Sequence, residues 1–460
     1  MGIVNYTELH EKFVNSARPH VLMITNHGIH QWEVIPGLQD TGGQNVFVNQ
    51  FSDAIVGFGF KVTIVNRGGY RHPLTGKWQR GLLYKNEFMR LYYLEDGLDE
   101  FVRKEDMFER IPYLSKALKH WIVSESVNVD LIVSHYWDAA LLGVLCNESL
   151  PGRVKHIWVP HSLGIIKKRN VAPGEWERLR IQERIDIEKQ LIGKLDGIAS
   201  TSTLIQKSLV EDYGYKGPEI FLPPCIDTKR YYPHRVDKES DIWKFLSSKT
   251  GKTVEELSRM GIVVEISRTD TTKGKDVLIK AFAEVIKRLP HSLLVVAIDE
   301  SRRELSSILK KLINDLGIAG NTVTVGSIWN LLPDLYAISD VYCTPAIQEG
   351  FGMSAQEAAA TGVPVIASER VPFVTEYLLG ERQREIQIGT DVADRIVIGE
   401  GGVKVSVSDV RGFAFAIELL LKDEELRARM GKRAYEITIP YFTWDSMVRR
   451  FLEATGFKNF

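Results

Sequence analysis

Residues 341–368 read VYCTPAIQEGFGMSAQEAAATGVPVIAS, and this pattern is the strongest indication of the architecture. It opens with a short apolar run and continues through a glycine loop. A helix is predicted from Met353, because small apolar residues then recur at helical spacing. A second apolar run, residues 363–368, follows the helix. Strand, helix and strand in this order predict a βαβ unit whose two strands lie parallel in one sheet.

The same alternation extends through the chain in both directions. Short β-branched runs predict strands at residues 21–24, 61–66, 131–134, 154–160, 197–200, 262–266, 293–298 and 323–325. Longer amphipathic stretches predict helices, notably at residues 105–125, 175–194, 424–436 and 443–453. Two such series predict an α/β protein with two Rossmann-like domains facing across a cleft, and ligands in such folds bind beyond the carboxyl ends of the strands.

A polar and charged stretch, residues 231–258, separates the two series. We predict an N-terminal domain over residues 1–235, a linker over 236–258 and a C-terminal domain over 259–438. The last residues, 439–460, are predicted to form a helix that packs back toward the N-terminal domain.

Bulk composition narrows the possible functions. The chain has 460 residues, 44% of them hydrophobic and 25% charged, with a formal net charge of -1. Nucleic acids and anionic membranes select strongly basic proteins, so neither is expected as a partner. No apolar run approaches the roughly 18 residues of a membrane span, and the N-terminus lacks an apolar signal core, so we expect a cytoplasmic protein.

Two loops that follow predicted strands hold candidate anion-binding residues. The 40–44 loop reads DTGGQ, and its Gly42 and Gly43 let backbone amides approach a ligand, although a tight turn without a ligand explains them equally well. Arg268 and Lys273 lie one loop apart and suit a diphosphate, while a solvated basic loop is the alternative. The chain lacks the G-x-G-x-x-G pattern here, which argues against a nicotinamide cofactor.

Two glutamates and a histidine follow other predicted strands. Glu349 lies in the glycine loop at the predicted helix start, and Glu357 lies about one turn into that helix. Their carboxylates could accept hydrogen bonds from sugar hydroxyls, or either could merely cap the helix. His161 follows residues 154–160, where a lone histidine is more often structural than catalytic.

Basic residues concentrate in the first domain although the whole chain is nearly neutral. They are Lys104, Lys167, Lys168, Arg178 and Arg180. Ammonium and guanidinium groups suit a phosphate or carboxylate on a small substrate. The alternative is a solvated surface, in which some of these residues pair with Glu175, Glu177 and Glu183.

Taken together, these motifs resemble glycosyltransferase family 4, the retaining enzymes of the GT-B fold, over nearly the whole chain. The strongest mark is the two-glutamate motif from Glu349 to Glu357. The 40–44 and 161–164 motifs are similar to those of the branch that contains sucrose-phosphate, mannosylfructose-phosphate and mannosylglucosyl-3-phosphoglycerate synthases. The resemblance implies transfer of glucose or mannose from UDP-glucose or GDP-mannose to a phosphorylated small sugar acceptor, with anomeric retention.

The resemblance also implies roles for the candidate residues, with the acceptor on the N-terminal domain and the nucleotide sugar on the C-terminal domain. Catalytic contacts are implied for His161, Arg268, Lys273 and Glu349, donor contacts for Gly42, Gly43, Phe351, Gly352, Met353 and Glu357, and acceptor contacts for Gln44, Lys104, Lys167, Lys168, Arg178 and Arg180. His161 would contact the hexose and Glu357 the ribose. The family needs no metal, cofactor or enzyme nucleophile, because the leaving phosphate helps to deprotonate the acceptor.

Two other functions are compatible with a fold of this kind. One is a sugar-nucleotide 2-epimerase, and the other is a non-catalytic sugar-nucleotide sensor. The two-glutamate motif together with the 161–164 motif favours the transferase. Release of nucleoside diphosphate that depends on an acceptor would separate the transferase from both alternatives.

Overall fold

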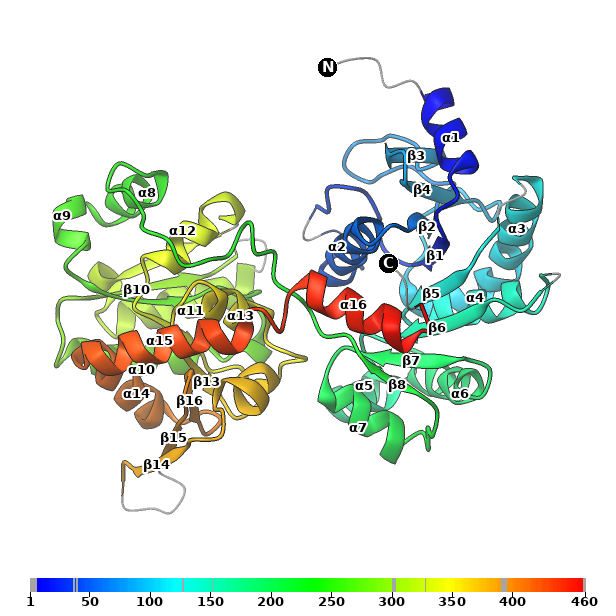
Figure 1. Cartoon of the computed structure of the whole chain (residues 1–460). Coiled ribbons are helices and arrows are strands. Elements are labelled where there is room, and N and C mark those ends of the chain that lie inside the picture. The colour runs from blue at the N-terminus through cyan, green and yellow to red at the C-terminus, as the bar shows by residue number, and fades with distance from the viewer. Residues whose placement is uncertain are drawn as a thin grey trace. The chain divides into compact units, whose positions relative to one another are not determined.

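The computed structural model describes residues 6–457 apart from 36–37, 39, 126–127, 151, 300–302, 327 and 390–394. The chain folds into two compact units (Figure 1). Unit 1 comprises Met1–Pro223 with Trp444–Phe460, and unit 2 comprises Pro224–Thr443. Among the described residues, each unit has an eight-stranded sheet that is mainly parallel. The predicted fold class, two parallel-sheet α/β domains, is confirmed.

The sheet of unit 1 has the strand order β3-β4-β2-β1-β5-β6-β7-β8. Its strands are β1 (His20–Ile24), β2 (Lys61–Arg67), β3 (Gly81–Asn86), β4 (Met89–Leu94), β5 (Leu131–His135), β6 (Lys155–Val159), β7 (Gly197–Ser200) and β8 (Glu219–Phe221). Neighbours are parallel except β3 and β4, which form an antiparallel hairpin at one edge. Ile24 lies opposite Val65 of β2 and Ser134 of β5, so the loops after these strands start from one edge of the sheet.

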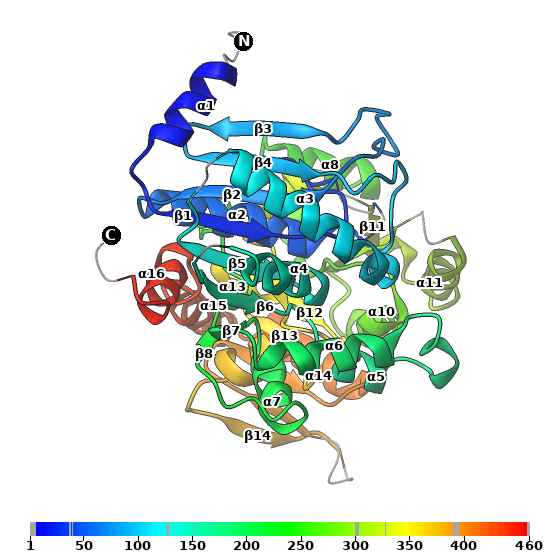
Figure 2. The ribbon, with the colours of Figure 1, turned by 90° about the vertical axis from the view of Figure 1, so that its right-hand side faces the viewer.

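Helices pack on both faces of this sheet. They are α1 (Tyr6–Asn15), α2 (Gly43–Gly57), α3 (Ile111–Ser124), α4 (Trp137–Asn147), α5 (Gly164–Asn170), α6 (Ile181–Ile192), α7 (Thr203–Glu211) and α16 (Trp444–Ala454). Leu114 and Leu118 of α3 share a buried cluster with Leu22 of β1, so α3 covers one face (Figure 2). The last helix, α16, packs on α2, where the rings of Phe51 and Phe451 lie 5.1 Å apart.

The sheet of unit 2 has the order β11-β10-β9-β12-β13-β16-β15-β14. Its strands are β9 (Gly261–Glu265), β10 (Ser292–Ala297), β11 (Thr322–Val325), β12 (Val341–Thr344), β13 (Val365–Ser368), β14 (Arg384–Gln387), β15 (Arg395–Ile398) and β16 (Gly402–Val405). In this order, neighbouring strands are parallel from β11 at one edge as far as β16. Strand β15 pairs antiparallel with both β16 and β14.

The helices of unit 2 enclose a second core. They are α8 (Asp241–Thr250), α9 (Val254–Leu257), α10 (Lys275–Ile286), α11 (Arg303–Asp315), α12 (Leu332–Ala337), α13 (Met353–Ala360), α14 (Val410–Lys422) and α15 (Glu424–Thr438). Phe282 of α10 and Phe413 of α14 are buried against Val263 of β9 in this core. No helix of the described residues is long and apolar enough to cross a membrane.

The structure differs from the expected linker over residues 236–258. This segment forms α8 and α9 and belongs to unit 2, because Ile242, Trp243 and Leu246 are buried there. The first unit also ends earlier than residue 235, at Pro223. In α8 a few apolar side chains at helical spacing lie within a mostly polar stretch, and the average composition conceals them.

Candidate active site

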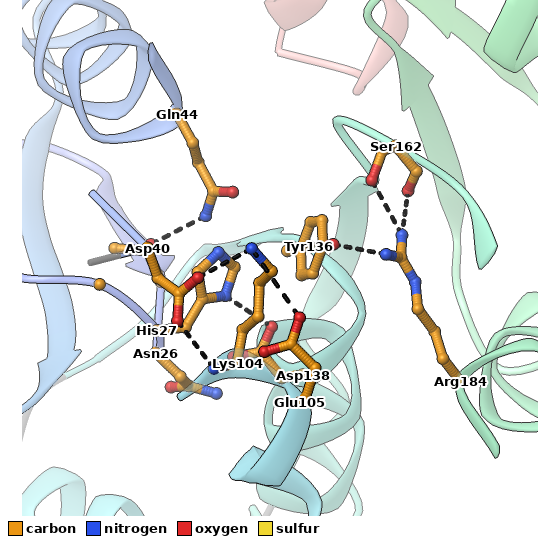
Figure 3. Close-up of polar contacts among 12 residues, drawn as sticks. Asn26, His27, Asp40, Gln44, Lys104, Glu105, Tyr136, Asp138, Ser162 and Arg184 are labelled. Atoms are coloured by element: carbon orange, nitrogen blue, oxygen red, sulfur yellow. Dashed lines mark hydrogen bonds and ion pairs between the residues drawn. The ribbon is translucent and has the colours of Figure 1, made fainter. Parts of the chain in front are cut away.

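In unit 1, buried polar side chains gather beyond the carboxyl ends of β1 and β5 (Figure 3). His27 follows β1, and Asp138 lies in the first turn of α4, directly after β5. Both side chains are buried, and a hydrogen bond joins His27 Nδ1 to Asp138 Oδ1 at 3.0 Å. Because buried polar groups need partners, this pair holds the two loops together.

His161, predicted to contact the hexose, follows β6 with a backbone φ of 54°, which is uncommon for a residue with a side chain. Its Nε2 lies 3.0 Å from Nδ1 of His135, the last residue of β5. Burial, and to a smaller extent the charge of His27, lowers the pKa of His161 to about 3. The imidazole is therefore neutral near pH 7 and can offer a sugar hydroxyl only an uncharged hydrogen bond.

The loop that contains His161 is held by a buried ion pair of α6. Arg184 Nε donates to Glu188 Oε1 at 2.7 Å, and both side chains are buried. Arg184 also donates to the carbonyl oxygen of Ser162 at 2.6 Å (Figure 3). Glu188 Oε2 accepts from the amide of Gly164 at 2.8 Å. A Cβ at position 164 would lie 2.7 Å from a side-chain carbon of α6, so glycine is needed there. This pair could not be recognised from the sequence, because a solvent-exposed ion pair on a helix has the same i, i+4 spacing.

Lys104, predicted to bind the acceptor, begins the short helix η1 (Lys104–Arg110) and is bonded to the 40–44 loop. Its Nζ lies 2.8 Å from Asp40 Oδ1, and its amide donates to Asp40 Oδ2 at 3.1 Å (Figure 3). Burial acts to raise the pKa of Asp40, but the hydrogen bonds and charge of Lys104 outweigh it and keep that pKa below its ordinary value. The lysine is therefore positioned by a charged partner.

A small pocket in unit 1 brings together three of the five predicted basic residues, Lys104, Lys167 and Arg180. The other charged residues among those that line it are Arg184, Glu105 and Glu183. Four of the lining side chains are cationic and two are carboxylates. Each cation has an acidic partner, because Lys104 pairs with Asp40, Lys167 with Glu105, Arg180 with Glu109 and Arg184 with Glu188. An anion that binds here must therefore compete with these carboxylates for the cations.

The other two predicted basic residues do not reach this pocket. Lys168 is half-buried and donates to Gln182 Oε1 at 3.0 Å. Arg178 is exposed and pairs with Glu175 within the same turn of chain. Both side chains find partners at the solvent face, so for these two residues the solvated alternative describes the structure better than an acceptor contact.

The glycine pair of the 40–44 loop lies where α2 begins. The amide of Gly42 donates to Asn45 Oδ1 at 3.0 Å, and Gln44 Nε2 lies 3.2 Å from Thr25 Oγ1. A Cβ added at Gly42 or Gly43 would meet no atom within 4 Å. Internal packing therefore does not demand glycine at either position, and the open space leaves room for a ligand against the backbone.

In unit 2, two loops beyond the carboxyl ends of β9 and β12 meet around a lysine–glutamate pair. Lys273 Nζ lies 2.6 Å from Glu349 Oε2, and only 8% of the lysine side chain is exposed. The loops approach closely because residue 274 is glycine, with φ 62°; a Cβ there would lie 2.3 Å from a backbone oxygen of the second loop. Arg268, in contrast, has 85% of its side chain exposed, so the structure does not bring the two predicted cations together.

The amides predicted to hold the hexose lie at the start of α13. Gly352 has φ 110°, a region that favours glycine, and Met353 is the first helical residue. The ring of Phe351 is buried against Phe373, with centroids 5.6 Å apart. Phe351 therefore anchors the loop through its side chain, and its backbone amide is the group available to a ligand at the helix N-terminus.

Glu357, predicted to bind the ribose, faces α12 and the segment after β8. The hydroxyl of Tyr336 donates to Glu357 Oε2 at 3.3 Å. Burial raises the pKa of Glu357 to about 7, against the opposing effects of Tyr336, Arg230 and Tyr231. The sequence analysis missed Arg230 and Tyr231, because they lie in no motif and were assigned to the first domain.

Replacing Glu357 with glutamine is expected to stabilise the protein at high pH. The pKa of about 7 in the folded protein exceeds the ordinary value of 4.5, so burying the ionised carboxylate reduces stability progressively between these values and fully above pH 7. The variant should therefore match wild type below pH 4.5 and gain about 1–2 kcal/mol of unfolding free energy by about pH 8, after allowance for partial exposure. Thermal denaturation across this range tests it, with exposed Glu369→Gln as control. A pH-independent difference would contradict it.

Among the described residues, no group of three or more histidine, cysteine, aspartate or glutamate side chains is arranged so that it could hold a metal ion.

Comparison with known proteins identifies two family models along the chain. The model described as Glycosyltransferase Family 4 matches residues 41–230, and the model described as Glycosyl transferases group 1 matches residues 254–437. The first match lies almost entirely in unit 1, and the second lies within unit 2. Together they cover both sheets except for β1, which precedes the first match.

Individual proteins with similar sequence and structure agree with these matches. The mannosylfructose-phosphate synthase of Agrobacterium fabrum is 28% identical over 80% of this chain and 79% of its own. The D-inositol 3-phosphate glycosyltransferase of Nocardia farcinica is 28% identical over 91% of this chain and 85% of its own. The sucrose-phosphate synthase structure from Thermosynechococcus elongatus superposes with a TM-score of 0.73 over 95% of this chain and 98% of its own, at 22% identity.

Proposed function

The chain belongs to glycosyltransferase family 4, with the GT-B fold, and from this premise we propose that it transfers a hexose from a nucleotide sugar to a phosphorylated sugar with anomeric retention. The observation that carries the proposal is the unit 1 pocket, whose lining brings together the predicted acceptor residues Lys104, Lys167 and Arg180. The two relatives named above support it, since their names specify a mannosylfructose phosphate product and an inositol phosphate acceptor. Both names also favour a transferase over a sugar-nucleotide 2-epimerase.

The pocket suits a phosphate in the chemistry of its side chains. Lys104 and Lys167 supply ammonium groups, and Arg180 supplies a guanidinium group, which matches phosphate oxygens in pairs. Tyr136 adds a hydroxyl, which a buried Arg184 already contacts (Figure 3). A phosphate entering here would gain charge-assisted hydrogen bonds that a neutral sugar cannot form.

In unit 2 the proposed donor contacts follow from the Lys273–Glu349 pair. As the bond between hexose and diphosphate breaks, negative charge accumulates on the diphosphate, and an ammonium group held nearby stabilises it. Glu349 would then accept hydrogen bonds from hexose hydroxyls, next to the amides at the start of α13. In the mechanism implied by the family, the leaving phosphate deprotonates the acceptor on the same face of the sugar. UDP-glucose and GDP-mannose are both candidate donors.

The acceptor phosphate is expected to be essential for efficient transfer. Fructose 6-phosphate should be compared with fructose, and inositol 3-phosphate with inositol, using each candidate donor and following nucleoside diphosphate release. Lys104→Ala and Lys167→Ala should each raise KM for the phosphorylated acceptor by about 10- to 100-fold, the loss expected for one charged hydrogen bond.

Lys168→Ala is the matched control, because Lys168 is a neighbouring lysine outside the pocket. It should change KM by less than about twofold, as expected for a surface residue. Equal reaction of phosphorylated and dephosphorylated acceptors would overturn the proposal. A phosphate requirement that neither pocket lysine affects would retain the acceptor class but remove its assignment to this pocket. Conversion of the nucleotide sugar to its 2-epimer without any acceptor, and without net release of nucleoside diphosphate, would instead favour the epimerase.

A further inference from the structure

A buried ion pair lies at the base of the loop that carries the two predicted diphosphate cations. Glu265 is the last residue of β9, and Lys275 is the first residue of α10. Lys275 Nζ lies 2.5 Å from Glu265 Oε2, and only 1% of the lysine side chain and 0% of the glutamate side chain are exposed. The residues between them, 266–274, include Arg268 and Lys273. The pair therefore joins the two ends of this diphosphate loop.

The ammonium group of the pair also holds the backbone of the diphosphate loop. Lys275 Nζ donates to the carbonyl oxygen of Ser267 at 3.2 Å. Near the other end of the loop, the carbonyl oxygen of Thr272 accepts from the amide of Ile347 at 2.7 Å. Ile347 lies two residues before Glu349 in the second loop of the site. A shift of the diphosphate loop is therefore passed through the backbone to the loop of Glu349.

Stability alone does not account for a charged pair at this place. Glu265 Oε1 is buried and makes no hydrogen bond with the residues that the structure describes. Taking two charges out of water costs more than an incompletely bonded pair returns, and apolar residues of similar volume often stabilise a protein at least as well. The pair is therefore better explained by where it places the ammonium group than by its contribution to folding.

We propose that Lys275 and Glu265 are positioning residues of the donor site, which fix the diphosphate loop through the carbonyl oxygen of Ser267. The inference rests on the proposed function, in which Lys273 binds the diphosphate. Glu265 keeps the ammonium group at the base of the loop, and the ammonium group holds the carbonyl. A loop that is already fixed needs less ordering when the donor binds, and this strengthens binding.

Two variants separate positioning from stability. Glu265→Gln keeps an oxygen that accepts from Lys275, but it leaves a buried ammonium group without its carboxylate. It should lower the denaturation midpoint and leave the KM for the nucleotide sugar within about threefold of wild type. Glu265→Leu/Lys275→Met removes both charges and should recover most of the midpoint. It should raise the KM for the nucleotide sugar by at least about 10-fold, because Ser267 has lost its donor. The KM for the acceptor should change by less than about twofold in both variants.

Hydrogen exchange of the loop gives a second measurement, which does not need activity. The amides of Thr272 and Lys273 are bonded to Asp270 within the loop, at 3.0 and 3.2 Å, so their exchange reports how well the loop is ordered. Both amides should exchange at least about 10-fold faster in the double variant than in wild type. Lys287→Met is the control, because it breaks an exposed pair with Glu284 near the end of α10, and it should change neither the KM values nor the exchange.

Two results would overturn the proposal. One is a double variant with the KM and the loop exchange of wild type, and this result decides the matter even if Glu265→Gln fails to fold. The other is a midpoint and a KM that fall and rise together in both variants, because a purely structural role predicts that behaviour. If wild type consumed no nucleotide sugar, the proposed function would fail, whereas the exchange of the loop would still test the positioning.

Discussion

Replacing Lys273 with alanine is expected to lower kcat/KM for hexose transfer by about 10²- to 10³-fold, equivalent to roughly 2–4 kcal/mol of transition-state stabilisation. The side chain is almost fully buried and lies 2.6 Å from Glu349, so its ammonium group is already positioned before a donor arrives. Its removal also leaves Glu349 unpaired where the negative diphosphate should bind. Both effects disfavour the charged transition state. Steady-state kinetics with a saturating acceptor measure the loss.

Two further variants make this result specific. Lys280→Ala removes an exposed lysine of α10 that pairs with Asp276, and it should leave kcat/KM within about twofold of wild type. Arg268→Ala tests the second predicted cation, for which the sequence hypothesis expects a loss of the same size as for Lys273. Because 85% of the Arg268 side chain is exposed, that loss requires the arginine to turn toward the donor. Turnover near wild type in both Lys273→Ala and Arg268→Ala would disprove the diphosphate assignment.

Replacing Arg184 with methionine is expected to cost about 3–5 kcal/mol of unfolding free energy, because it leaves Glu188 buried without its cation. The double variant Arg184→Met/Glu188→Leu removes both charges and should recover much of this stability. It should not recover activity, because the Ser162 carbonyl and the Gly164 amide then lack the partners that hold the His161 loop. We expect kcat to stay reduced by on the order of 10²-fold.

Chemical denaturation of the three proteins, together with their kinetics, separates stability from positioning. Lys207→Met is the control, since Lys207 and Glu211 form an exposed pair with the same i, i+4 spacing, and its loss should cost less than about 0.5 kcal/mol. If the double variant regained full activity along with its stability, the pair would serve folding only. If Arg184→Met were as stable as wild type, the pair would not be a buried ion pair in solution.

The parallel strands could be predicted from the sequence because they are buried on both faces. Every residue of β1 and β2 is buried, and over residues 21–24 and 62–65 the apolar and β-branched residues run without interruption and stand out from the chain around them. Strand β3 was missed for the opposite reason, since it is largely exposed and its sequence GLLYKN includes polar residues. Its partner β4 is mostly buried, but Arg90 interrupts its apolar run MRLYYL. The antiparallel strand β14 at the edge of the second sheet is similarly exposed and was also missed.

The site residues that lie in short sequence motifs could be predicted from the sequence. The residues whose role depends on their burial could not. Lys273 and Glu349 were identified separately from their loops, and the structure joins them. Arg184 and Arg230 were missed, because a charged residue in an amphipathic stretch gives no sign that its guanidinium is buried. Lys168 was grouped with the pocket lysines because it is close to them in the sequence. In the structure it lies on α5, and its side chain donates to Gln182 instead of lining the pocket.

The contacts of α6 with the His161 loop bear on how this enzyme could be given a new acceptor. Gly164 and the Arg184–Glu188 pair are interlocked, so a change at any one of them disturbs the other two. A directed-evolution library should keep these three constant and vary Lys167 and Arg180, whose side chains line the pocket from outside that interlocked group. Libraries restricted in this way should yield a larger fraction of folded variants than libraries that randomise all five positions, because the invariant group removes the most destabilising substitutions.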